Sequence, residues 1–285
     1  MAVACEVRVG QFTVRGMSLG GVETYLQVPQ LSLMFDVGYC PRSLAATPRL
    51  LITHAHGDHS GGLIGMLSLR LLHGMKEPLE VYAPAPMCEG LRTAVDAYGA
   101  LQGTPYRWTL KPVTPGMEFS LNRQYSVRTF ESVHVTHTIG YSVWETVRKL
   151  KAEFVDLPGQ EIARRKKEGE DLFNHIERPV LSFPGDTTVE TLDQQPHLYE
   201  SRILLLEATY LDDRRSPEQC RQHGHVHLDE VLERAERFQN QHLVLTHFSQ
   251  SYQPDEIREI LTRRCQGRFV PEVQPLLPNT PGWPG

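Results

Sequence analysis

The sequence predicts an α/β fold built as one domain, and three observations support this prediction. Strand-like segments fill the first fifty residues, and from about residue 60 onward strand-like and helix-like segments alternate. The 285 residues are 40% hydrophobic and 22% charged, the balance of a globular chain that buries a sizeable core. Because nothing in the middle of the chain has the composition of a linker, residues 1–285 are predicted to form a single domain.

The N-terminal part has the pattern of a β-meander followed by a strand and two helices. Apolar or alternating segments, separated by Gly and Pro, predict strands at 6–15, 25–28, 31–36, 50–53 and 79–82. Apolar residues at helical spacing predict helices at 61–72 and 86–98.

The C-terminal part has more strands and one clear amphipathic helix. Strands are predicted at 106–112, 125–135, 140–146, 179–183, 203–206 and 243–246. The helix before the last strand has one apolar face, made of Leu228, Val231, Leu232, Ala235 and Phe238.

Two segments depart from this regular pattern. The interval 148–172 is predicted to be a reduced, arm-like insertion with a short helix, and it contains the basic run 164–167 (Arg-Arg-Lys-Lys). We interpret this run as a solvated helix face, with a phosphate-contacting patch as the alternative. From about residue 274 the chain is rich in Pro and Gly, so an irregular surface tail is expected there.

Bulk properties exclude several classes of protein. The N-terminus lacks a secretory signal pattern and no apolar run approaches the length of a membrane span, so we expect a cytoplasmic protein without a membrane partner. Five scattered cysteines without a CxxC pair indicate reduced thiols rather than a disulfide framework or a thiolate metal site. A net charge of −5 gives no global signature of nucleic-acid binding.

The strongest functional signal is the segment THAHGDH directly after the predicted strand 50–53. It contains His54, His56, Asp58 and His59, and so dense a set of potential ligands is not expected in a core. On a turn after a strand, His54 and His56 can face one metal ion while Asp58 and His59 face another. Imidazole and carboxylate groups suit zinc, so this turn is predicted to be a metal site.

Polar candidates recur where other apolar strands end. Asp186 follows the strand 179–183, Glu207 follows 203–206, and His247 follows 243–246, while His134 ends the run 125–135. Because layered α/β folds form ligand sites at strand ends, these side chains could converge on the THAHGDH turn. The remaining histidines have no cluster partners in the sequence and are expected to be surface or hydrogen-bonded side chains: His73, His175, His197, His223 and His242.

Together these residues resemble the metallo-β-lactamase superfamily, with its HxHxDH motif, a later histidine, a GD pair and a terminal TH. The resemblance implies a four-layer αββα sandwich with a binuclear metal site at one edge. It further implies that His54, His56 and His134 bind one zinc ion, that Asp58, His59 and His247 bind the other, and that Asp186 bridges them. His137 competes with His134, which has the better spacing to the Gly140-Tyr141 pair.

Within the superfamily the chain resembles ribonuclease Z, which removes 3′ trailers from transfer RNA precursors. The similarity covers about residues 50–252 and includes THAHGDHSGGL, FPGDT, LEATY and LTHFSQSY. It implies that Glu207 and His225 act as a proton shuttle, with His227 as the alternative to His225, and it implies a homodimer. The chain departs from the family in lacking the DCGEGTQ turn, where it has Phe35-Asp36-Val37-Gly38, and in lacking a long Gly- and Pro-rich arm.

The sequence therefore predicts a binuclear zinc-dependent phosphodiesterase that cleaves tRNA precursors, with Mn²⁺ or Fe²⁺ as other possible metals. A hydroxide between the metals would attack, Asp58 would orient it, and His225 would protonate the leaving oxygen. The first alternative is a hydrolase of the same fold acting on a small phosphodiester, a cyclic nucleotide or a sulfate ester. The second is a non-enzymatic scaffold or RNA-binding protein, which the complete ligand set disfavours.

Overall fold

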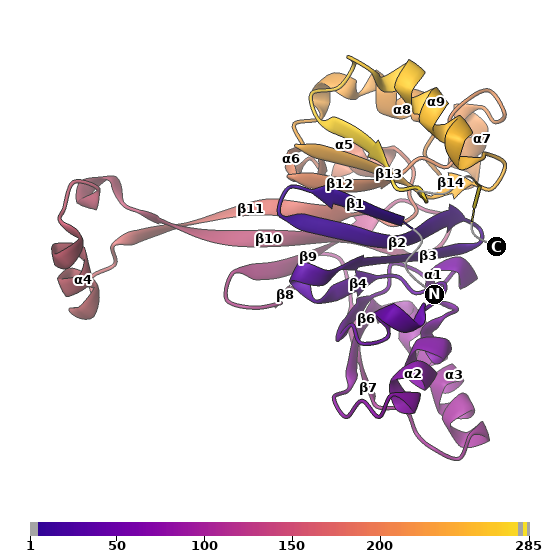
Figure 1. The fold of residues 1–285 in the computed structure, drawn as a ribbon, viewed down its shortest axis with the longest axis horizontal. Coiled ribbons are helices and arrows are strands. Elements are labelled where there is room, and N and C mark those ends of the chain that lie inside the picture. The colour runs from indigo at the N-terminus through magenta and orange to yellow at the C-terminus, as the bar shows by residue number, and fades with distance from the viewer. Residues whose placement is uncertain (1–4, 279–281, 284–285) are drawn as a thin grey trace.

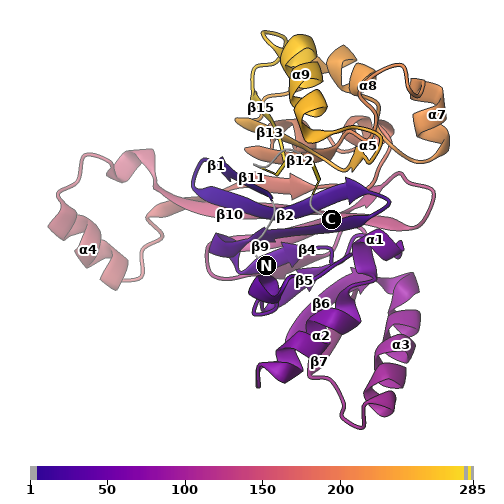
Figure 2. The same ribbon diagram turned by 45° about the vertical axis from the view of Figure 1, so that its right-hand side comes forward.

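In the computed structural model, which describes residues 5–278 and 282–283, two β-sheets pack face to face and helices cover their outer faces (Figures 1 and 2). The first sheet contains β1 (Cys5–Val9), β2 (Phe12–Gly20), β3 (Glu23–Val28), β4 (Leu33–Phe35), β5 (Arg49–Leu51), β6 (Leu79–Pro84), β7 (Trp108–Val113) and β14 (Phe248–Ser249). The second contains β8 (Glu118–Ser120), β9 (Tyr125–Ser132), β10 (Thr138–Leu150), β11 (Phe173–Phe183), β12 (Ile203–Glu207), β13 (His242–Thr246) and β15 (Glu272–Pro275). This is the four-layer αββα arrangement that the sequence predicts.

The helices lie in the connections between strands. They are α1 (Gly57–Ser60), α2 (Leu63–Leu72), α3 (Cys88–Leu101), α4 (Gly159–Lys167), α5 (Glu190–Gln194), α6 (His197–Glu200), α7 (Pro217–Gln222), α8 (Leu228–Glu233) and α9 (Pro254–Cys265). α2 joins β5 to β6 and α3 joins β6 to β7, which are parallel neighbours and need such a crossover. No helix among the described residues has the length and apolarity needed to cross a bilayer.

The parallel strands of the second sheet are buried on both faces, and their side chains alternate between two cores. Leu205 and Val244 pack into the core between the sheets. Leu204 and Leu206 instead pack into the core beneath α8 and α9. Period-two alternation thus explains why these strands are continuous apolar runs in the sequence.

The ribbon of β10 and β11 extends far beyond the sandwich and carries α4 at its tip (Figure 1). The two strands stay paired from Tyr141 opposite Phe183 to Leu150 opposite Phe173. Their inner ends are buried, whereas residues 174–178 of β11 are exposed. The predicted interval 148–172 therefore forms the outer part of a longer arm. Strand prediction stopped short because the exposed part of the ribbon lacks an apolar face.

Several predicted elements differ from the structure. The single strand at 6–15 is a hairpin, because the chain turns at Gly10 in a left-handed conformation. The tail is not irregular from residue 274, since Gln274 and Pro275 still pair with β13 as part of β15. The helix through Phe238 ends as an α-helix at Glu233, and α9 was not predicted. Residues 279–281 and 284–285 of the expected tail lie outside the described residues.

Candidate metal centre and active site

Residues that follow two parallel strands of the first sheet, at the carboxyl ends of these strands, form one half of the site. β4 is followed by Asp36, and the neighbouring β5 is followed by Thr53 and His54. The chain then turns into α1, which carries Asp58 and His59. Because carboxyl ends of parallel strands share one sheet edge, these groups lie together.

The second sheet delivers the other half in the same way. Asp186 follows β11, Glu207 ends β12 and His247 follows β13. These three strands are neighbours in the sheet and run parallel to one another. His134 follows β9, which runs in the same direction as β11 because each is antiparallel to β10. His247 has a φ of 57° and Asp36 a φ of 55°. Non-glycine residues rarely adopt this backbone conformation, and it is often retained at functional sites.

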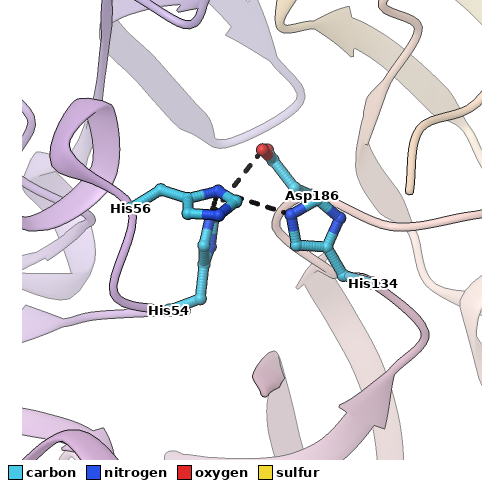
Figure 3. Close-up of side chains that lie close together, drawn as sticks. All are labelled: His54, His56, His134 and Asp186. Atoms are coloured by element: carbon cyan, nitrogen blue, oxygen red, sulfur yellow. Dashed lines mark hydrogen bonds and ion pairs between the residues drawn. The ribbon is translucent and has the colours of Figure 1, made fainter. Parts of the chain in front are cut away.

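One cluster joins His54, His56, His134 and Asp186 (Figure 3). His54 Nε2 lies 3.0 Å from His56 Nδ1, which lies 3.5 Å from His134 Nε2. The Asp186 Oδ2 atom is 3.8 Å from His54 Nε2. Four ligand atoms therefore face a common point.

A second cluster joins Asp58, His59, Asp186 and His247. His59 Nε2 is 3.3 Å from His247 Nε2 and 3.2 Å from Asp186 Oδ1. The Asp58 Oδ2 atom is 3.5 Å from both imidazole nitrogens. Asp186 is thus shared, with one carboxylate oxygen in each cluster.

Hydrogen bonds around the second cluster determine which imidazole nitrogens carry a lone pair. His59 donates from Nδ1 to the buried Asp36 carboxylate at 2.8 Å, so its Nε2 is free of hydrogen when the ring is neutral. The Thr209 hydroxyl donates to Glu207 at 2.6 Å and therefore accepts from His247 Nδ1 at 3.1 Å. The two Nε2 atoms are then both acceptors, and a cation between them satisfies both.

The first cluster is held by the same kind of contact. The Thr53 hydroxyl donates to Asp36 and accepts from His54 Nδ1 at 2.9 Å. His134 donates from Nδ1 to the Gly224 carbonyl at 2.8 Å. Gly224 has a φ of 79°, and a Cβ there would lie 2.4 Å from His134 Nδ1, so glycine is required for this close approach. The donor set therefore fits divalent metal ions in both clusters.

The electrostatics of the site favour a positive charge. Burial raises the pKa of Asp186, but His247 and His59 outweigh it and hold that pKa well below its usual range. Burial lowers the pKa of His59, yet Asp186 and Asp36 outweigh burial and raise it well above its usual range. Burial lowers the pKa of His54 to about 2, so this ring stays neutral and available as a ligand.

A carboxylate–histidine pair lies next to the second cluster. His225 donates from Nδ1 to the buried Glu207 carboxylate at 2.9 Å, and its ring stacks on His247 with centroids 5.3 Å apart. Burial lowers the pKa of His225, but Glu207 outweighs it and raises it to about 9. Glu207 also accepts hydrogen bonds from the backbone N–H groups of Thr187 and Val226, so its position is fixed.

The competing histidines lie elsewhere. His227 is buried, donates from Nε2 to the Asp212 carbonyl and accepts from the Asp229 N–H, so it caps the start of α8. His137 is exposed, and it is absent from the metal-type clusters of the described residues.

Comparison with known proteins identifies the family. A family model described as a beta-lactamase superfamily domain matches residues 40–248. The tRNase Z TRZ1 of Arabidopsis thaliana is 33% identical over 258 residues, which is 90% of this chain and 92% of that protein. The chain belongs to the ribonuclease Z family of the beta-lactamase superfamily. The chloroplastic tRNase Z TRZ2 of the same plant is 32% identical, over 95% of this chain and 76% of that protein.

Solved structures agree with the fold of this ribonuclease Z family member. The short form of human tRNase Z aligns with a TM-score of 0.57 at 20% identity, covering 98% of this chain and 95% of the other. The metallo-beta-lactamase fold protein YhfI of Bacillus subtilis aligns with a TM-score of 0.58 at 14% identity, covering 94% and 97%. The predicted fold class and family are therefore confirmed, and membership in the family implies divalent-metal binding.

Sequence reasoning missed the residues that orient the histidines. Asp36 accepts a hydrogen bond from His59 directly and is linked to His54 through the Thr53 hydroxyl. The Thr209 hydroxyl accepts a hydrogen bond from His247, and the Gly224 carbonyl accepts one from His134. Asp36 carried a usable signal, since it follows an apolar strand just as Asp186 does. Gly224 carried none, because its role is a backbone carbonyl brought to His134 by the fold.

Proposed function

We propose that this chain is a binuclear zinc-dependent endonuclease of the ribonuclease Z type, which hydrolyses a phosphodiester bond in tRNA precursors. The observation that carries the proposal is the pair of clusters sharing Asp186, with Glu207 and His225 beside them. The proposal is also supported by the similarity of most of this chain to proteins named tRNase Z.

In this proposal His54, His56 and His134 hold one zinc ion, Asp58, His59 and His247 hold the other, and Asp186 contributes to both. Manganese or iron could replace zinc, since imidazole and carboxylate accept several divalent ions. Two such ions supply a water of lowered pKa and neutralise charge on the phosphoryl oxygens.

The protein's own groups orient the attack and supply a proton. Asp58 accepts a hydrogen bond from the Gly21 N–H at 3.0 Å, which holds its carboxylate toward the shared centre as an orienting acceptor. His225 keeps Nδ1 on Glu207, which leaves Nε2 to protonate the leaving oxygen. Glu207 is a positioning residue that favours the charged imidazolium.

The arm gives a second point of contact with a large RNA in this proposal. Helix α4, which carries the basic run, lies at the tip of the arm (Figure 2). Lys166 and Lys167 are exposed there and have no ion pair among the described residues. Cations far from the reacting centre suit phosphates of a folded substrate rather than of a small diester.

The deciding experiment is cleavage of a 3′-extended tRNA by the purified, zinc-loaded protein, with the product ends mapped to the nucleotide. We expect one dominant cut at the junction between the tRNA body and the trailer. Bis(p-nitrophenyl) phosphate is assayed in parallel, and activity on this small diester alone would contradict the tRNA assignment. We expect two zinc ions per chain, and a zinc content of about one per chain or less would contradict the binuclear site.

The proposal also includes a homodimer in the cytoplasm. The five cysteines are unpaired and buried, as expected in a reducing compartment. Sedimentation of the purified chain and the location of a tagged copy in cells test these two points. A monomer at micromolar concentration, or residence in an organelle, would contradict the respective point.

A further inference from the structure

A cavity of about 330 Å³ opens directly beside the proposed catalytic groups. His225 and His247 line it, together with the turn of Gly20 and Gly21. Tyr210, Arg215, His223 and Gln250 line it as well. His223 was expected to be a surface or hydrogen-bonded side chain; it is exposed, and it lies on this wall two residues before His225.

Arg215 is an unpaired cation in this wall. No carboxylate among the described residues lies within ion-pair distance of its guanidinium, and the side chain is exposed. Its neighbour Arg214 is different, because it pairs with Glu256 and lies 4.1 Å over the Tyr252 ring. Arg214 therefore stabilises the fold, whereas Arg215 is available to a ligand.

The guanidinium of Arg215 lies over the ring of Tyr210. The guanidinium carbon lies 6.0 Å from the centre of the Tyr210 ring. A flat ring held between two planes at carbon contact distance needs a separation of about 7 Å. Arg215 would therefore have to move outward to admit a base, and its exposed, unpaired side chain can do so. Tyr210 itself is held in place edge-on against the buried Tyr252 ring.

The glycine turn keeps the opposite side of the cavity free. A Cβ at Gly20 would lie 3.2 Å from Cε1 of His247, so a larger residue would press on this imidazole and occupy the cavity. The turn also holds Asp58 through the Gly21 N–H. A planar ligand can therefore approach the Tyr210–Arg215 pair from the side of this turn.

We propose that this cavity binds the nucleoside that carries the leaving oxygen, with its base stacked between Tyr210 and Arg215. The inference rests on the proposed function, in which His225 protonates that oxygen. The nucleoside attached to it must then lie within reach of His225, and the cavity next to His225 is lined by groups that stack on bases. Stacking tolerates every base, so the subsite takes any nucleotide at that position.

Binding of AMP and UMP, each as the 3′- and the 5′-monophosphate, is measured by calorimetry on the zinc-loaded protein and tests the subsite without turnover. The isomer whose phosphate is on the leaving oxygen, identified from the mapped cleavage products, is the one compared between variants. Tyr210→Leu keeps apolar bulk but removes the flat ring, and we expect Kd to rise roughly tenfold or more for both nucleotides. Arg215→Ala should raise Kd several-fold, and its folding is secure because the side chain is exposed and unpaired. Tyr210→Phe should bind as the wild type does. Arg92→Ala, which removes an equal charge from exposed α3, is the matched control.

Cleavage then tests which nucleotide occupies the cavity. The mapped products show which nucleotide leaves with the new hydroxyl, and an abasic residue is placed there in a 3′-extended tRNA. We expect kcat/KM of the wild type to fall roughly tenfold or more, and Tyr210→Leu to lose little further on the abasic substrate.

The two proposals fail in different ways. The subsite would be overturned if each nucleotide bound to Tyr210→Leu and Arg215→Ala with the same Kd as to the wild type. This outcome would count against the subsite whatever the protein cleaves. Additive losses from the abasic residue and Tyr210→Leu would overturn it too. A wild type that binds nucleotides through Tyr210 but leaves 3′-extended tRNA intact would instead contradict only the proposed function.

Discussion

Asp58 is proposed both to hold a zinc ion and to orient the attacking water. Its Oδ2 atom faces His59 and His247 and accepts the Gly21 N–H, while Asp186 is shared by both clusters. We expect Asp58→Ala to lower kcat roughly 10²- to 10⁴-fold, because the attacking water loses its acceptor. Single-turnover cleavage measures this, with thermal unfolding as the check that the fold is intact. A substantial residual rate with two zinc ions bound would refute the role.

Asp36 controls histidines in both clusters from a buried position. An Asp36→Asn variant can place its amide NH₂ toward His59 Nδ1, and a donor there favours the tautomer with hydrogen on Nε2. We expect zinc affinity to fall roughly 10- to 100-fold, the usual cost of losing such a contact. Competition with a chelating dye measures it. Asp96→Asn on exposed α3 is the control, and unchanged affinity in Asp36→Asn would contradict the role.

These two residues show what sequence does and does not disclose at this scale. Asp58 was predicted because it sits in a dense motif with His54, His56 and His59, where local spacing suffices. Asp36 and Gly224 act through hydrogen bonds to residues 23 and 90 positions away. Only the fold brings such partners together, so no local pattern could identify their roles.

Helix α4 carries four basic residues that are not equivalent. Arg164 pairs with Glu161 and Glu168, and Arg165 pairs with Glu161, so these charges are largely neutralised locally. Lys166 and Lys167 have no such partner among the described residues. The two interpretations of the basic run thus apply to different members of it.

We expect the double substitution Lys166→Ala and Lys167→Ala to weaken binding of a 3′-extended tRNA. It should also flatten the dependence of log affinity on log salt by about 1 to 2, because each lost phosphate contact releases about one counterion fewer. Anisotropy titrations from low to high salt measure both quantities. Lys76→Ala with Arg92→Ala, two exposed cations on the body, is the control. An unchanged salt slope would assign the run to solvation alone.

The root of the arm is fixed by a buried carboxylate on β10. Glu145 accepts hydrogen bonds from Arg178 at 2.6 Å and from Gln124 at 2.9 Å, and Arg202 lies 3.3 Å away. Burial raises the pKa of Glu145, but these donors outweigh it and lower the pKa below the ordinary value of 4.5. The ionised form therefore stabilises the fold above pH 4.5, and this contribution is lost as the pH falls through the depressed pKa.

We expect Glu145→Gln to lower the free energy of unfolding at pH 7 by about 1 to 3 kcal/mol, because two arginines lose their anion. The deficit should shrink as the pH falls below 4.5, where the native carboxylate itself becomes protonated. Denaturant unfolding at several pH values measures this. Glu153→Gln, an exposed residue of the arm, is the control, and a pH-independent deficit would refute the electrostatic cause.

At the scale of the whole molecule, the site joins two halves of the chain. Each half supplies candidate metal ligands from strand ends of its own sheet, so ions bound as proposed would tie the sheets together at one edge. We expect removal of metal by a chelator to lower the unfolding temperature by on the order of 10 °C, given ions held far above their Kd. Calorimetry measures the shift, and re-addition of zinc should restore it. If the unfolding temperature of an Asp186→Ala variant still fell by the same amount on metal removal, the stabilisation would not come from ions at this shared site.

The overall fold was predictable because its strands and most helices repeat apolar residues at the periods of two and 3.6. The strand ends then located Asp186, Glu207 and His247, which the fold does bring together. The length of the arm was not predictable, since its exposed strands are stabilised by pairing with each other rather than by a buried face. Helix α9 was missed although Ile257, Ile260 and Leu261 form an apolar face at helical spacing.

The short loop around Gly224 contacts two functional side chains of the site. Its carbonyl holds His134, and the next residue presents His225 to Glu207. Any displacement of this loop would therefore disturb a proposed metal ligand and the proposed proton donor in the same movement. With the roles proposed above, damage at this point would weaken metal binding and remove the proton donor together, so metal affinity and the proton-transfer step would be lost as a unit.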